Sequence, residues 1–320
     1  MSRQGPKATF RVGTRGSRLA MAQTQIVTST LSRLYPNANF EIVTIRTKGD
    51  VDKRPLFTMD EKGIFEKEVN EAVVNGSVDF AVHSLKDVPS NLASELVVAS
   101  IPKRARPNDV LVNGRGLNLH EMASGSIIGT SSLRRAVQVM HSRPDLIVKP
   151  IRGNVETRVK KVISGEYDAA ILAEAGLSRL GMKDMIAERF DIREFVPAPG
   201  QGAIAIVCKK QRKDLIRTLQ YIEDPKSRAE VSAERSLLDK MEGGCRFPIG
   251  AIALSSEHSM TIYASVSSSD GKQFVRIRST GPADKPERLG IVAADKLIDR
   301  GAMELAVGWR TAVEEWNRKL

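Results

Sequence analysis

The chain of 320 residues is long enough for two or three domains, and its 41% of hydrophobic residues favours a packed core and excludes a wholly disordered chain. Its 49 Lys and Arg residues outnumber 38 Asp and Glu residues, and the net charge of +11 indicates an anionic partner: nucleic acid, acidic lipid, or a small ligand rich in carboxylates or phosphates. Aromatic residues make up only 5% and do not alternate with the basic ones, which argues against a surface that stacks single-stranded nucleic acid.

No apolar run approaches the length of a membrane span, and the start M-S-R-Q-G-P-K lacks the apolar segment of a secretion signal. Two cysteines, Cys208 and Cys245, are too few for a disulfide framework or for a zinc site made of cysteines alone. We therefore expect a protein of the reducing cytoplasm with no membrane partner and no metal site.

Short strands alternate with helices over the first two thirds of the chain. The predicted strands cover residues 9–13, 40–46, 79–84, 96–101, 109–112, 126–129, 146–151, 169–173 and 203–209, and the predicted helices cover about 17–34, 65–74, 132–142 and 154–164. Such alternation is typical of parallel sheets with helices on both faces.

Two segments rich in proline or glycine, residues 101–108 and 196–203, are predicted to cross between two α/β lobes. The strand at 203–209 then returns to the first sheet. Two crossings of this kind predict a cleft between the lobes, with strand ends facing it. We call residues 101–108 and 196–203 the crossing segments.

The sequence changes character after about residue 222. A long helix at about 225–241 precedes three predicted strands, I-G-A-I-A-L, M-T-I-Y-A-S-V and F-V-R-I-R-S-T, of which the last two flank a hairpin turn at Asp270-Gly271. A last helix covers about 286–300. We therefore predict an α+β third domain with an antiparallel sheet, and domain bounds of 6–102 plus 203–220, 106–196, and 222–320.

Three predicted strand-to-helix turns carry arginines where a helix begins: G-T-R-G-S-R-L-A (13–20), G-T-S-S-L-R-R (129–135) and I-R-G-N-V-E-T-R (151–158). A helix N-terminus is already partly positive, so each adjacent cation costs about 0.3–1 kcal/mol. For a single arginine, solvation or pairing with an acid such as Glu156 is the better explanation. For three equivalent turns, we favour an anionic ligand bound by the set.

The segment A-V-H-S-L-K-D-V-P (81–89) ends a buried strand with Ser84, Lys86 and Asp87, at the kind of strand end where ligands bind. Lys86 and Asp87 could equally form a surface ion pair, but a carboxylate there could also stabilise a cationic intermediate and transfer protons. His83 reads as a strand histidine with satisfied hydrogen bonds. The charged connection 47–63 is predicted to be a lid or a disordered loop.

Cys245, in M-E-G-G-C-R-F-P-I-G, lies between the helix at 225–241 and the next strand. The residues alone allow packing, metal binding, nucleophilic attack or covalent attachment, and burial as a small apolar side chain is the preferred reading. Cys208, inside A-I-A-I-V-C, is read as core.

Seven motifs together resemble the porphobilinogen deaminase, or hydroxymethylbilane synthase, family. They stand in the family's order from about Phe10 to the last helix: G-T-R-G-S-R-L-A, H-S-L-K-D-V-P, G-T-S-S-L-R-R, R-G-N-V-E-T-R, A-G-L-S-R-L, P-A-P-G-Q-G-A and E-G-G-C-R-F-P-I-G. The resemblance implies two periplasmic-binding-protein-like α/β lobes with a cleft between them, and a C-terminal α+β domain with a three-stranded antiparallel sheet. It also implies a monomeric transferase of tetrapyrrole biosynthesis, which joins four porphobilinogen molecules and releases ammonia.

The resemblance implies a role for each candidate residue. Cys245 would hold a dipyrromethane cofactor through a thioether, and Asp87 would lie beside the pyrrole nitrogens and assist loss of ammonia. The other implied cofactor contacts are Ser84, Lys86, Ser132, Arg134 and Arg135, with Lys86 beside Asp87 in catalysis. The implied contacts of substrate and growing chain are Arg15, Ser17, Arg152, Arg158, Arg179, Gln201 at a hinge, and Lys62 on the loop.

The chain departs from the family pattern at Asp60-Glu61 and Thr58 in the loop, at Asn108, and at Arg246-Phe247. Three other functions remain open from the residues alone. A non-catalytic anion-binding protein would need the arginines but neither Cys245 nor Asp87. A cysteine hydrolase would need a histidine base that no motif marks, and a nucleic-acid binder would use the same net charge.

Overall fold

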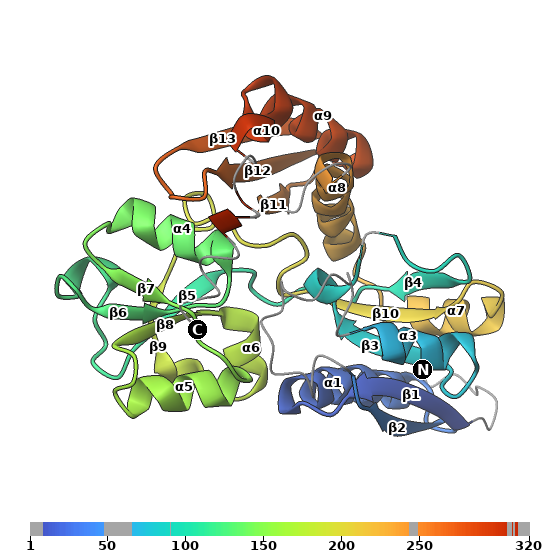
Figure 1. Cartoon of the computed structure of the whole chain (residues 1–320). Helices are drawn as coiled ribbons and strands as arrows, with labels where there is room; N and C mark the ends of the chain where they lie inside the picture. The colour runs from blue at the N-terminus through green and yellow to red at the C-terminus, as the bar shows by residue number, and fades with distance from the viewer. Residues whose placement is uncertain are drawn as a thin grey trace. The chain divides into compact units, whose positions relative to one another are not determined.

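The computed structural model describes residues 9–47, 66–89, 91–242, 249–305, 309 and 311–312 (Figure 1). The loop lysine Lys62 and the proposed anchor Cys245 lie outside these residues, as do the family departures at 58–61 and 246–247. The chain forms two compact units, one reaching to Ala105 and including Gly202–Arg228, the other formed by Arg106–Gln201 and the chain from Ala229 onward. The division into three domains, with the bounds given above, remains a prediction.

The first unit is built on a five-stranded sheet of order β2-β1-β3-β10-β4. Its strands are β1 (Thr9–Arg15), β2 (Asn39–Ile45), β3 (Phe80–Ser84), β4 (Leu96–Ser100) and β10 (Ile204–Lys209). β1 pairs in parallel with β2 and β3, whereas β10 runs antiparallel between β3 and β4. Its helices are α1 (Arg18–Leu34), α3 (Lys67–Val74) and α7 (Lys213–Gln220), with a 3-10 turn η1 (Leu85–Asp87) after β3.

Alternation along β3 places helices on both faces of this sheet. Phe80 packs in one apolar cluster with Leu31 of α1 and Leu215 of α7. Its neighbour Ala81 faces the other way and packs with Val69 of α3. The prediction of a sheet covered on both faces is therefore confirmed for this unit.

The second unit begins with a sheet of the same pattern, of order β7-β6-β8-β5-β9. Its strands are β5 (Asp109–Val112), β6 (Ile127–Gly129), β7 (Ile147–Lys149), β8 (Ala169–Ala173) and β9 (Ile186–Arg189). β6 is parallel to β7 and β8, and β5 is antiparallel to β8 and β9. The helices are α4 (Leu133–Ser142), α5 (Val155–Ile163) and α6 (Glu174–Arg179), with 3-10 turns η2 (Leu119–Glu121) and η3 (Lys183–Met185).

Two expectations are corrected here. The sheets are mixed rather than parallel, because the strand that follows each crossing segment, β5 or β10, enters its sheet in the opposite direction. β9 was not predicted from the sequence. The return of the strand at 203–209 to the first sheet is confirmed, since β10 lies between β3 and β4.

The rest of the second unit is a three-stranded antiparallel sheet with helices, as predicted. Its strands are β11 (Ile249–Ser255), β12 (Ser259–Ser267) and β13 (Phe274–Pro282). Its helices are α8 (Pro225–Glu242), whose first turn belongs to the first unit, α9 (Pro286–Asp299) and α10 (Ala302–Leu305). The predicted turn between β12 and β13 is confirmed, with Gly271 at φ +70°. Gly290 of α9 lies so close to α8 that a Cβ atom there would collide with the carbonyl oxygen of Ala233.

Across the described ranges, no helix combines the length and the apolar character needed to cross a lipid bilayer.

Candidate functional site

Two motifs from distant parts of the sequence meet at one edge of the first sheet. β1 and β3 are parallel neighbours, so their carboxyl ends, Arg15 and Ser84, lie at the same edge. A pocket that is partly open to solvent lies here. Its lining includes four predicted site residues, Arg15, Ser17, Ser84 and Asp87, and six more residues, Leu19, Ala20, Gln23, Glu66, Val82 and His83.

The hydroxyl groups of Ser17 and Ser84 are each held by a hydrogen bond to a residue of α1. Ser17 is the N-cap of α1, and its hydroxyl accepts a hydrogen bond from the Ala20 N–H at 3.3 Å. Ser84 accepts a hydrogen bond at 2.8 Å from the side-chain amide of Gln23. Sequence reasoning missed Gln23. The available signal was a polar residue on the face of α1 that also carries the core residue Val27.

Asp87 and Lys86 lie on η1, the short turn that follows β3, and both side chains are exposed. The turn is closed by a backbone hydrogen bond from Val88 to Leu85 at 3.0 Å. The Asp87 carboxylate therefore borders the pocket while remaining open to solvent.

His83 is buried at 6% exposure, with its Nε2 3.1 Å from Oδ1 of Asn70. Burial, and then the charge of Arg15, lower the pKa of His83 to about 4. The imidazole is therefore neutral at pH 7. The prediction of a strand histidine with a satisfied hydrogen bond is confirmed.

Glu66 is a pocket residue that sequence reasoning missed. Its side chain is buried at 3% exposure just before α3, beside Arg15 and Asp87. In the sequence it sits in F-E-K-E-V, which reads only as the start of an amphipathic helix, so no local signal marked it.

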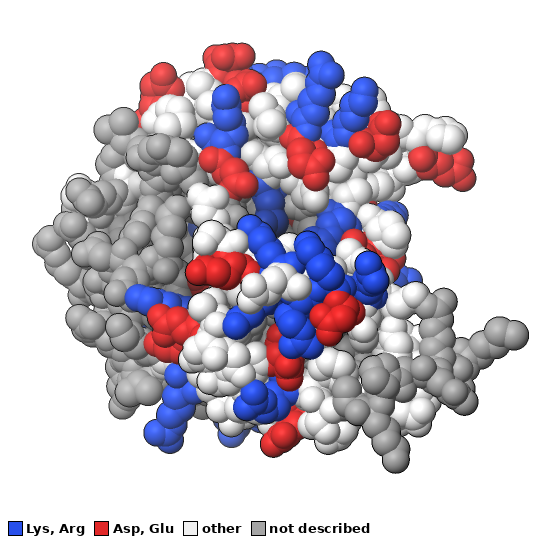
Figure 2. Space-filling model, turned by 90° about the vertical axis from the view of Figure 1, so that its right-hand side faces the viewer, with Lys and Arg blue, Asp and Glu red and all other residues white. Residues whose placement is uncertain are grey.

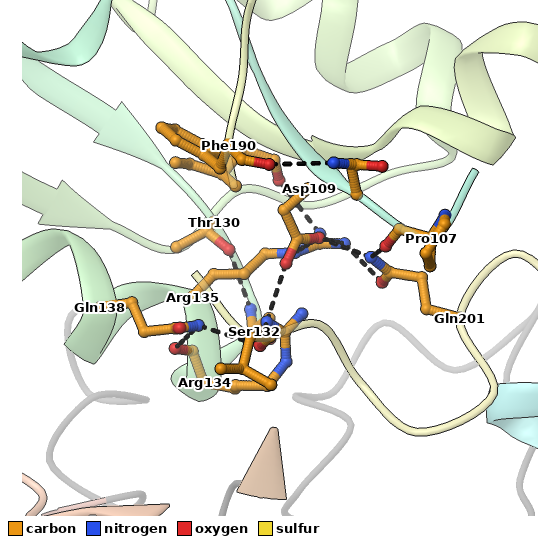
Figure 3. A network of polar contacts seen from close by, with 12 residues as sticks. Pro107, Asp109, Thr130, Ser132, Arg134, Arg135, Gln138, Phe190 and Gln201 are labelled. Atoms are coloured by element: carbon orange, nitrogen blue, oxygen red, sulfur yellow. Dashed lines mark hydrogen bonds and ion pairs between the residues drawn. The ribbon is translucent and has the colours of Figure 1, made fainter. Parts of the chain in front are cut away.

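In the second unit, a buried ionic network joins α4 to the start of β5 (Figure 3). The two oxygens of Asp109 accept hydrogen bonds from Arg134 Nη1 at 2.8 Å, from Arg135 Nε at 2.9 Å, and from Gln201 Nε2 at 2.9 Å. Gln201 Nε2 also donates to the Pro107 carbonyl at 2.6 Å, which ties the two crossing segments together.

The network fixes the charge of Asp109. Burial alone would raise the pKa of Asp109, but the charges of Arg134 and Arg135 outweigh it and hold this pKa below its usual range. Arg135 also donates to the Ile171 carbonyl and to Gln201, so all three of its nitrogens bind protein groups. The hydrogen bonds of the Arg134 side chain within the described residues all use Nη1, which leaves Nε and Nη2 available.

Cations gather where α4 and α5 begin. Asn154 caps α5, and Arg158 on the first turn donates from Nε to the Gly153 carbonyl at 2.9 Å. Burial, and then the nearby charges of Arg135 and Arg152, lower the pKa of Arg158 to about 10. Arg158 is therefore close enough to Arg135 and to Arg152 to be repelled by both, which an anion beside it would relieve.

The remaining predicted residues of this unit lie at helix ends. Ser132 is the N-cap of α4 without a side-chain capping bond, and its own N–H donates to Thr130 Oγ1 at 3.2 Å. Arg179 is the last residue of α6, and burial lowers its pKa to about 10.

Cys208 lies on β10, in the first unit, and its free thiol is fully buried. Burial raises the pKa of this thiol to about 11. The prediction that Cys208 is a core residue is therefore confirmed.

Basic side chains are interspersed with acidic ones on the face drawn in Figure 2. Where the chain is described, no three His, Cys, Asp or Glu side chains lie close enough together to hold a metal ion. The side chains that the described residues bring together at these sites are arginines, serine hydroxyls and the carboxyl groups of the pocket.

Comparison with known families matches nearly the whole chain. A family model described as "Porphobilinogen deaminase, dipyromethane cofactor binding domain" matches residues 10–217, and one described as "Porphobilinogen deaminase, C-terminal domain" matches residues 228–299. A probable porphobilinogen deaminase of Nitrosopumilus maritimus (strain SCM1) is 53% identical over 307 residues, covering 96% of this chain and 98% of the relative. The porphobilinogen deaminase of Desulforudis audaxviator (strain MP104C) is 42% identical over 295 residues, covering 92% and 96%.

Solved structures match about two thirds of the chain. The methionine-binding protein MetQ is similar with a TM-score of 0.43 and 12% identity, covering 67% of this chain and 89% of MetQ. A putative lipoprotein from Actinomyces odontolyticus ATCC 17982 has a TM-score of 0.42 and 14% identity, covering 68% and 90%. At such TM-scores, neither likeness bears on activity.

Proposed function

The chain belongs to the porphobilinogen deaminase family, and we infer from this membership that it is a transferase of tetrapyrrole biosynthesis. It releases ammonia from porphobilinogen and joins four molecules head to tail into hydroxymethylbilane. Residues 10–217 match the family's cofactor-binding domain, so the cofactor is a dipyrromethane.

The observation that carries this proposal is the meeting of Arg15 and Ser17 with Ser84 and Asp87 around one pocket. Porphobilinogen has an acetate, a propionate and an aminomethyl group. Its recognition therefore needs cations for two carboxylates, and an acidic group beside the carbon that loses ammonia. A simple anion-binding site would have no use for Asp87.

Asp87 stabilises the positive charge that develops on the substrate. When the carbon–nitrogen bond breaks, its electron pair leaves with ammonia, and the positive charge spreads over the pyrrole ring to its N–H. The carboxylate of Asp87 accepts a hydrogen bond from that N–H. Lys86, next to it on η1, binds a carboxylate of the bound pyrroles.

The arginines of the second unit bind the carboxylates of cofactor, substrate and growing chain. Arg158 is repelled by Arg152 and by Arg135, and a polycarboxylate would offset that repulsion. Arg134 has Nε and Nη2 left for a cofactor carboxylate, while Arg135, whose nitrogens all bind protein, contributes its charge. Ser132 and Ser84 add hydroxyl donors, and Arg15 and Ser17 bind the incoming substrate.

Three further roles complete the proposal. Arg179 helps to extend the chain of pyrroles, and Lys62 contacts it from the loop. Gln201 acts at a hinge, which its hydrogen bonds to both Pro107 and Asp109 support. The enzyme works as a monomer in the cytoplasm, without nucleic acid.

Cys245 anchors the dipyrromethane through a thioether. When bound, this group supplies the pyrrole carbon to which the first substrate is joined. This assignment follows the family resemblance of the motif E-G-G-C-R-F-P-I-G. The burial of the other cysteine agrees with it, because Cys208 is fully buried in β10 and its thiol is protonated at neutral pH.

The intact mass of the protein purified from cells tests the anchor, with Cys245→Ser as the variant and Cys208→Ser as the matched control. We expect wild type and Cys208→Ser to carry an added mass of two linked pyrrole units, and Cys245→Ser to carry none. The wild type should also release ammonia from porphobilinogen. A cofactor-loaded Cys245→Ser protein would refute the anchor, and a wild type inert toward porphobilinogen would refute the function.

A further inference from the structure

Glu66 places a second carboxyl group in the pocket that holds Asp87. It precedes α3, and its side chain is 3% exposed. Glu66 lines the pocket together with Arg15, His83 and Asp87, among others. Its Oε2 atom is buried and accepts no hydrogen bond from any described group. A buried carboxyl oxygen without a partner is costly, so a structural explanation would have to identify a compensating contact.

The obvious structural role of Glu66 is capping of α3, and the geometry does not support it. Glu66 occupies the N-cap position, but its side chain makes no capping hydrogen bond and its backbone is helical, at φ −115° and ψ −13°. A carboxylate near a helix N-terminus gains some stability from the helix dipole. An exposed carboxylate outside the pocket would gain the same stability, so the helix dipole does not explain why Glu66 is buried in the pocket lining.

The charged groups around Glu66 favour the binding of a cation in the pocket. Burial, and after it the charges of Asp87 and Glu68, raise the pKa of Glu66 to about 7, while its own backbone N–H and the charge of Arg15 act against this rise. His83, the remaining titratable group lining the pocket, is neutral. Near neutral pH a bound cation would therefore favour the ionised form of Glu66 over the protonated one.

Porphobilinogen supplies one cation, the ammonium form of its aminomethyl group. We propose that Glu66 binds this group and thereby selects the amino substrate. The proposal rests on the function proposed above. In it, arginines hold the two carboxylates of the substrate, Asp87 lies beside the pyrrole nitrogen, and Glu66 holds the nitrogen that will leave. The carboxyl group gives up its proton to solvent as the ammonium group binds.

The test compares two substrates that give the same four-ring product. One is porphobilinogen, and the other is its analogue with a hydroxymethyl group in place of the aminomethyl group, from which water leaves instead of ammonia. The variant Glu66→Gln keeps size and hydrogen bonding but removes the charge. Glu71→Gln, an exposed position on α3 away from the pocket, is the matched control.

We expect Glu66→Gln to lower the ratio of kcat/KM for porphobilinogen to kcat/KM for the analogue by about 10- to 100-fold, as for loss of a charged hydrogen bond. Glu71→Gln should leave the ratio unchanged, and Glu66→Asp, which keeps the charge on a shorter side chain, should restore part of it. In the wild type, kcat/KM for porphobilinogen should fall as the pH drops below about 7, since Glu66 becomes protonated. That fall should be absent in Glu66→Gln and with the analogue.

Equal losses for both substrates in Glu66→Gln would overturn the proposal, because damage to the fold or to the pocket would affect both alike. An unchanged ratio would overturn it as well. If Glu66→Gln does not fold, an unchanged ratio in Glu66→Asp decides against it. A wild type that converts neither compound would refute the family activity itself, and the role of Glu66 with it.

Discussion

Replacing Asp109 with asparagine should destabilise the second unit more than any surface change. The carboxylate accepts charged hydrogen bonds from Arg134 at 2.8 Å and Arg135 at 2.9 Å, and all three side chains are buried. Asparagine keeps the shape but removes the charge. Its NH2 group would also face a donor, either Arg134 on one side or Arg135 and Gln201 on the other.

The expected loss follows from the two guanidinium groups that stay buried. Removing one partner of a buried ion pair costs about 3–5 kcal/mol, because the remaining charge has neither water nor a counterion. Both arginines here depend on the same carboxylate. Asp295→Asn is the matched control: its side chain is 50% exposed and lies 3.4 Å from Lys240. An exposed pair of this kind contributes about 0–1 kcal/mol.

Native-state hydrogen exchange is the suitable assay, because a chain of two units need not unfold in one step. The amides of β5 and β8, which flank the network, should lose about 3–5 kcal/mol of protection in Asp109→Asn and little in Asp295→Asn. A loss below about 1 kcal/mol would mean that the arginines find other partners or water, and would refute the reasoning.

Three further predictions concern other parts of the chain. His83→Gln should make the stability of the fold less sensitive to acid. The pKa of His83 is about 4 in the folded chain and 6.5 in the unfolded one, so the wild type loses up to about 3 kcal/mol of stability from this group between pH 6.5 and 4. If the urea midpoint falls equally with decreasing pH in both proteins, His83 does not contribute. Gly290→Ala should cost about 1–3 kcal/mol in thermal unfolding by separating α9 from the Ala233 carbonyl, whereas Gly114→Ala, with open space, should not. Asp87→Ala should keep its fold, because the side chain is exposed, and lose most ammonia release; near-normal turnover would remove it from the mechanism.

Local patterns were enough to predict most elements. α1 begins directly after its capping residue Ser17, and β8 spans the predicted residues 169–173. The direction of β10 was not predictable, because a strand carries no local mark of whether its neighbours run parallel to it. β9 was missed because its four residues show no clear alternation.

The candidate site was predicted in part. The arginines at helix starts indicated an anionic ligand, but nothing near Arg134 in the sequence indicates that Asp109 is its partner. That pairing depends on β5 lying antiparallel beside β8, which is a property of the topology. Glu66 was missed for the same reason: its burial beside Asp87 arises from the packing of α3 against the sheet, and its neighbours in sequence give no sign of it.

The position of β10 has a consequence for how the protein forms during its synthesis. The first sheet needs β10 between β3 and β4, yet the ribosome makes β10 only after every strand of the second sheet. Until then β3 has one unpaired edge and β4 has no partner strand in the sheet, and unpaired strands of this kind promote aggregation. The strands of the second sheet, β5 to β9, come from one continuous stretch of chain and can pair first. A chain that ends just before Ile204 should therefore fold its second sheet while the first sheet stays incomplete, and the first sheet would need protection until β10 is added.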